Sequence, residues 1–150
     1  MQTKKAYTSL EIRKLRSAVR KAAAVSYQKG NITALREWMV VDMLSYTGMR
    51  VHEVVSLRCK HVYSAVGADE IYVPCAKADD RVIKVPIVLK EHIEAHIHWK
   101  QQISEGVAPE DFFFVGQRGQ WTEQAVQHIV KKYLKQLNLY VRKSCACIKT

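Results

Sequence analysis

Residues 47–57 have the sequence TGMRVHEVVSL, and this stretch decides the fold. Gly48 is expected to end one helix, because a residue without a side chain tolerates the left-handed backbone that closes a helix. Arg50 then lies in the first turn of a short helix, near free backbone amides and the positive end of the helix dipole. Both groups supply donors to an oxyanion, so Arg50 is a candidate phosphate ligand.

Glu53 lies one turn after Arg50 on the same helix face and can orient it. The alternative interpretation is an ordinary surface ion pair between the two side chains, since such pairs are common on helices. The surrounding elements decide between these interpretations.

Two amphipathic helices are predicted before this stretch. Thr8 and Glu11 have the spacing of a capping box, which opens a helix that ends near Gly30. Thr33 is expected to cap a second helix, and Gly48 ends it.

The pattern after the stretch predicts a small sheet and then more helix. Short runs rich in β-forming residues predict strands at 61–63, 71–73 and 81–87, with a hairpin turn at 76–80 between the last two. A helix over 88–103, a buried extended segment at 112–115 and a helix capped by Thr122 follow. We therefore expect one α+β domain over residues 1–150, mainly helical, with helices around a small antiparallel hairpin.

Composition narrows the class of partner. The 150 residues carry 24 Lys and Arg against 14 Asp and Glu, a net charge of +10, which favours a polyanionic partner. No apolar run reaches the length of a membrane span, so no membrane association is expected. The four cysteines form no Cys-x-x-Cys pair and suit reduced thiols, which predicts a cytoplasmic protein without a secretory signal.

Residues 47–57 resemble the first arginine box of the tyrosine recombinases, the family of phage integrases and chromosome-dimer resolvases. That box is Thr-Gly-x-Arg-x-x-Glu-x-x-x-Leu, and every fixed position is met. The family also has a β-hairpin whose turn carries a lysine, here Lys77, and a following strand that ends in Val-Pro and a hydrophobic residue, here residues 85–87. The resemblance extends from about Tyr7 to Leu139 and implies the N-terminal two-thirds of such a catalytic domain.

The resemblance implies double-stranded DNA as the partner and gives roles to three residues. Arg50 would hold the scissile phosphate, Lys77 would protonate the leaving 5′ oxygen, and Glu53 would support Arg50. Lys84 is the rival for the lysine role, but strand alternation makes it the weaker candidate. Arg50 and Lys77 are expected to face one basic concavity.

The sequence also departs from the family. There is no His-x-x-Arg box anywhere, and the family's nucleophilic tyrosine is absent, because Tyr140 precedes the place where that box would stand. Residues 140–150 have no family character and are expected to form a mobile tail, such as a frameshift or truncation produces. We therefore expect a truncated domain that is inactive alone and forms no covalent DNA adduct, unless a partner protomer supplies the tyrosine. Besides DNA, the expected partners are a full-length recombinase or a second copy of the chain.

Two other functions stay open: a non-catalytic module that binds DNA or regulates a recombinase, and an unrelated small basic nucleic-acid-binding protein. His92 and His96 lie one helical turn apart, and two interpretations apply to them: a metal site or a solvated helix face. The solvated face is preferred, and neither a metal nor a cofactor is expected. The run of phenylalanines at 112–114 is expected to be core rather than a platform for stacked bases.

Overall fold

The computed structural model describes residues 7–74 and 81–140. Its ten elements are α1 (Ser9–Gln28), α2 (Thr33–Thr47), α3 (Val51–Val55), α4 (Cys59–Ala68), β1 (Glu70–Val73), β2 (Arg81–Lys84), α5 (Ile87–Gln102), β3 (Val115–Gly116), β4 (Gly119–Gln120) and α6 (Glu123–Gln136). The predicted α+β class with a dominant helical part is confirmed. Lys77 and the expected turn at 76–80 lie outside the described residues, as does most of the expected tail.

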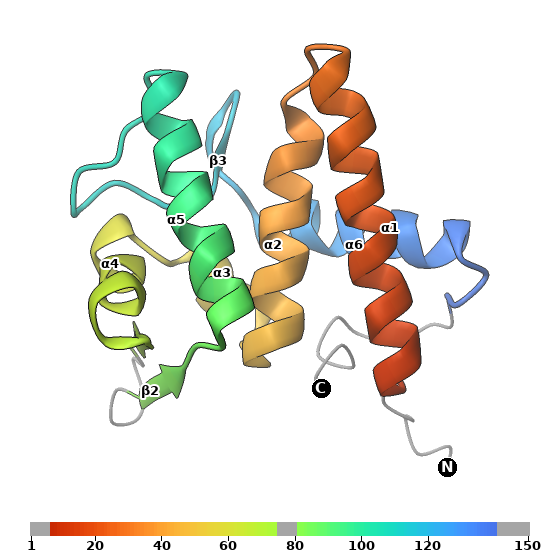
Figure 1. Ribbon diagram of the computed structural model, residues 1–150, viewed down its shortest axis with the longest axis horizontal. Coiled ribbons are helices and arrows are strands. Elements are labelled where there is room, and N and C mark those ends of the chain that lie inside the picture. The colour runs from red at the N-terminus through yellow and green to blue at the C-terminus, as the bar shows by residue number, and fades with distance from the viewer. Residues whose placement is uncertain (1–6, 75–80, 141–150) are drawn as a thin grey trace.

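Helix α2 lies between α1 and α5, and α6 passes behind α1 and α2 (Figure 1). Apolar side chains of α2 are buried on several sides, because α1, α5 and α6 pack against it. None of the helices in the described ranges is long and apolar enough to cross a membrane.

Helix α1 begins as its sequence predicts. The Thr8 hydroxyl accepts a hydrogen bond from the Glu11 amide at 3.1 Å, and the Glu11 carboxylate accepts one from the Thr8 amide at 2.9 Å. The start of α2 differs from the prediction. Thr33 lies inside the helix, and the Asn31 side chain accepts a hydrogen bond from its amide at 3.0 Å. An Asn side chain two residues before an amide reaches it readily, so Asn31 takes the role expected of Thr33.

Residues 61–63 are helical, so the predicted strand there is wrong. His61 lies in α4 and its Nδ1 accepts a hydrogen bond from the Arg58 amide at 2.9 Å, which satisfies an open donor at the helix start. Burial lowers the pKa of His61 and favours this neutral acceptor form. Cys59, Val62 and Ala65 are buried along one face of α4, and this packing outweighs the local β preference of the segment.

The predicted hairpin is confirmed in the described strands, but the second strand ends at Lys84 rather than at residue 87, because Pro86 caps α5, which begins at Ile87. β1 and β2 pair antiparallel, with Ile71 opposite Ile83 and Val73 opposite Arg81. The 112–115 segment is less regular than expected: it holds one bridge from Phe112 to Arg58 and then passes into the β3–β4 ribbon. Its Phe113 and Phe114 are buried in the core, as predicted.

Polar pairs join the helices inside this core. The Tyr133 hydroxyl donates to the Glu37 carboxylate at 2.7 Å, and Lys132 Nζ contacts the other Glu37 oxygen at 2.8 Å. These contacts attach α6 to the buried side of α2. Desolvation and the adjacent carboxylate both raise the pKa of Tyr133, which therefore stays a donor.

Candidate functional site

The end of α2 is closed by a tight turn. Gly48 has φ 67°, and its amide donates to the Leu44 carbonyl at 3.0 Å. The Thr47 hydroxyl donates to the Met43 carbonyl and accepts from the Met49 amide at 3.1 Å. Met49 is buried and fixes the start of the chain that leads into α3.

Arg50 is the residue just before α3, not a residue of its first turn as predicted. Its backbone is extended, and its carbonyl accepts hydrogen bonds from the amides of Glu53 and Val54 at 3.0 Å each. Val51 and Val54 are buried and hold the short helix against the core. The Arg50 side chain is exposed, and its guanidinium makes no ion pair with any residue that the structure describes.

Glu53 contacts Arg50 through the backbone. Its Oε1 accepts from the Arg50 amide at 2.8 Å and from Nη2 of Arg81 at 2.5 Å. The surface ion pair between Arg50 and Glu53 is therefore not the arrangement found. Only 8% of the Glu53 side chain is exposed, so this carboxylate positions the start of α3 and joins it to β2.

Arg81 is the residue that sequence reasoning missed. It begins β2, and through Glu53 it lies beside a helix that is 28 residues away in the chain. Successive residues of a strand point to opposite faces, so Lys84 points to the face opposite Arg81. The Lys84 side chain therefore faces away from the side of the hairpin that contacts Glu53. Lys77, in the segment between the two strands, lies outside the described residues, and its juxtaposition with Arg50 stays a prediction.

The model of the phage integrase family matches residues 8–147 of this chain. The chain belongs to the phage integrase family. The match begins at the capping residue of α1 and continues past Leu139, into the segment for which no family character was expected. A search of curated proteins finds no match.

Solved recombinases share the fold of this integrase-family chain. The XerA recombinase matches with a TM-score of 0.73 and 18% identity, covering 98% of this chain and 48% of its own. XerH recombinase bound to the difH substrate in a pre-cleavage complex matches with a TM-score of 0.71 and 17% identity, covering 98% and 41%. XerH in a post-cleavage complex with the palindromic difH substrate matches with a TM-score of 0.70 and 17% identity, covering 96% of this chain and 39% of its own. The chain thus spans less than half the length of these recombinases.

His92 and His96 of α5 do not form a solvated face in this integrase-family chain. His92 Nδ1 lies 2.6 Å from Asp42 Oδ2, and His96 is 5% exposed against the rings of Trp99 and Phe113. Burial, with the nearby Lys100 among lesser causes, holds the pKa of His96 well below its ordinary value. The preference for a solvated face was wrong, because the fold packs this side of α5 against α2. Within the described ranges no group of three or more His, Cys, Asp or Glu side chains could hold a metal ion.

Proposed function

We propose that this integrase-family chain binds duplex DNA through backbone phosphates and that Arg50 holds one of them. The observation that carries the proposal is the exposed Arg50 guanidinium, which has no ion-pair partner among the described residues and stands on a backbone held by the buried Met49 and Val54 and by Glu53. A cation on a preorganised backbone loses little freedom when it binds an oxyanion. Membership of the family and the net charge of +10 support the same partner.

Arg50 and Arg81 differ in how far they are available to DNA. Arg81 is neutralised by Glu53 at 2.5 Å, whereas Arg50 has no such partner among the described residues. We infer that Arg50 contacts phosphate and that Glu53 acts by positioning it. Lys77 is proposed as the acid for the leaving oxygen, because it belongs to the segment that follows β1 and precedes Arg81.

Strand cleavage requires groups from outside these 150 residues, since they contain no His-x-x-Arg box. We infer that a full-length recombinase would supply them, and that the chain alone, as one copy or as a homo-oligomer, binds DNA without cleaving it. A site of action on DNA in the cytoplasm is part of the same proposal.

Fluorescence anisotropy with a labelled duplex, titrated between about 50 and about 200 mM salt, tests this function. Each phosphate contact adds about 0.9 to the slope of log affinity against log salt. Arg50→Ala should lower the slope by about that amount and weaken binding to all duplex sequences alike. The control Lys29→Ala removes an exposed cation from the turn between α1 and α2. Equal effects of the two variants, or affinity independent of salt, would contradict the proposal.

A further inference from the structure

A groove with two joined cavities runs along α1, α2 and α5. The first cavity has a volume of about 620 Å³ and the second about 330 Å³. Both are lined by Arg20, Trp38, His92 and Ala95, so they form one continuous depression. α1 and α5 are its walls and α2 its floor (Figure 1). None of the residues that form the Arg50 site lines it.

The groove has the length of a helix. On α1 the lining runs from Arg13 to Tyr27, and at 1.5 Å per residue this is about 21 Å, or about four turns. On α5 it runs from Val88 to Trp99, about three turns. The lining residues recur at helical spacing on each wall, so each wall presents one unbroken stripe.

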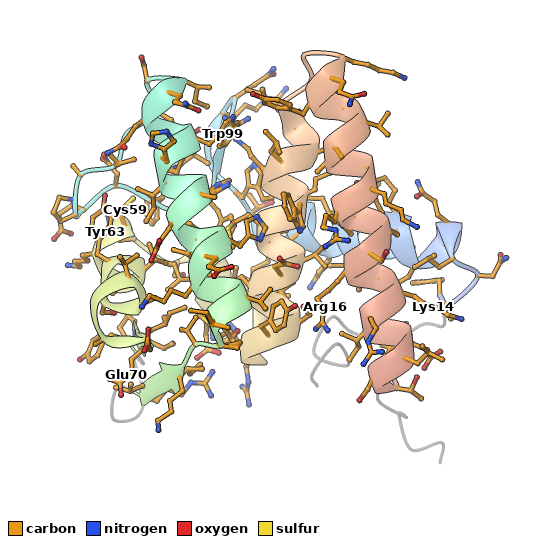
Figure 2. The ribbon with its side chains drawn as sticks, viewed as in Figure 1. Lys14, Arg16, Cys59, Tyr63, Glu70 and Trp99 are labelled. Carbon is orange, nitrogen blue, oxygen red and sulfur yellow. The ribbon has the colours of Figure 1, made fainter. Side chains whose placement is uncertain are left out.

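The α1 wall is basic. Arg13, Arg16 and Arg20 follow one another at helical spacing, and Arg16 is held by the Tyr46 ring, 4.2 Å from its guanidinium carbon. Figure 2 shows Arg16 on the side of α1 toward α2 and Lys14 on the opposite side. Arg13 and Arg20 are exposed and make no ion pair with the described residues. Two carboxylates line the first cavity: Asp42 on the floor is buried and already paired with His92 at 2.6 Å, and Glu91 is exposed on the α5 wall opposite the three arginines.

Apolar side chains stand open at both ends of the groove. Tyr27 is 62% exposed at one end and Val88 is 53% exposed at the other. The second cavity, which Tyr27 and Trp99 line, has almost wholly apolar and aromatic side chains apart from Arg20. Open apolar surface beside a row of charge is typical of a protein-binding surface.

We propose that this groove binds an acidic amphipathic helix of another protein. The apolar face of the bound helix lies on Trp38, Ala95 and Trp99, and the carboxylates of that helix contact the row of arginines on α1. The terminal segments of this chain do not have the required charge. Residues 1–6 and 141–150 contain five Lys and Arg and no Asp or Glu, so like charge opposes their binding to the arginine wall.

The test uses two synthetic helical peptides of four turns, one with leucines flanked by glutamates and one with lysines in place of the glutamates. Their binding to the full chain is measured by calorimetry. The acidic peptide should bind and the basic one should not. Arg13→Glu/Arg20→Glu should lower the affinity for the acidic peptide by about tenfold or more and raise the affinity for the basic one. Lys14→Glu/Lys21→Glu makes the same charge change on the outer side of α1 and should leave binding within about twofold.

Ala95→Trp is a second, uncharged variant, which fills the groove from an exposed position on α5. It should abolish binding of the acidic peptide while leaving the free energy of unfolding unchanged. The proposal would be overturned if the two double variants lost affinity for the acidic peptide equally, if binding survived Ala95→Trp, or if the acidic peptide did not bind at all. So would a loss of duplex DNA affinity confined to Arg13→Glu/Arg20→Glu, or self-association of the chain that this variant abolishes.

Discussion

Lys100 is fully buried, and its carboxylate partner should carry much of the stability of α5. Its Nζ lies 2.7 Å from Glu105 Oε2 and 3.0 Å from the Phe113 carbonyl. The other Glu105 oxygen pairs with Arg36 at 2.7 Å. The cluster thus joins α2, α5 and the loop that leads to the β3–β4 ribbon. We predict that Glu105→Ala lowers the free energy of unfolding by about 3–5 kcal/mol, because it leaves a buried ammonium with one carbonyl as its acceptor.

Lys100→Met should cost much less, about 1–2 kcal/mol. The methionine fills a similar volume without charge, Glu105 keeps Arg36, and the Phe113 carbonyl alone loses its donor. The double variant Lys100→Met/Glu105→Ala should be more stable than Glu105→Ala by roughly 2 kcal/mol, since no unpaired ammonium remains in the core.

Urea unfolding followed by circular dichroism measures all three differences. Glu94→Ala, an exposed carboxylate on the same helix, is the control and should change the free energy of unfolding by less than about 0.5 kcal/mol. The reasoning would be refuted if Glu105→Ala cost no more than Lys100→Met, or if the double variant showed the sum of the two single losses.

Two further predictions concern the pH dependence of stability and the turn before Arg50. Burial holds the folded pKa of His96 well below the ordinary 6.5, so below that pH the unfolded chain binds a proton that the folded chain does not. This group should therefore lower the free energy of unfolding by about 1.4 kcal/mol per pH unit as the pH falls below 6.5. His96→Leu should reduce that slope in urea titrations at about pH 7 and about pH 5, and an unchanged slope would contradict the assignment. Gly48→Ala should lower the free energy of unfolding by about 1 kcal/mol, because a side chain is strained at a φ of 67°. The loss should appear as a lower melting temperature, and an unchanged melting temperature would contradict this prediction.

Local chemistry was enough to predict several element boundaries. The Thr8 capping box, the Thr122 cap of α6 and the Gly48 end of α2 all act within four residues of chain, so they are visible in the sequence and the structure confirms them. The strand predicted at 61–63 was wrong. That segment is helical, with His61 closing the helix start and Cys59 and Val62 buried in the core.

The first arginine box also belongs to what the sequence determined by itself. Its spacing identified the family, and it placed Arg50 and Glu53 within one turn of each other, because both lie in a single short stretch of backbone. Which group Glu53 neutralises was decided by the tertiary structure alone. Arg81 reaches it across 28 residues because the hairpin packs beside α3. The same holds for the groove, whose lining residues on α1 and on α5 are more than 60 residues apart in the chain, since only packing brings such distant segments together.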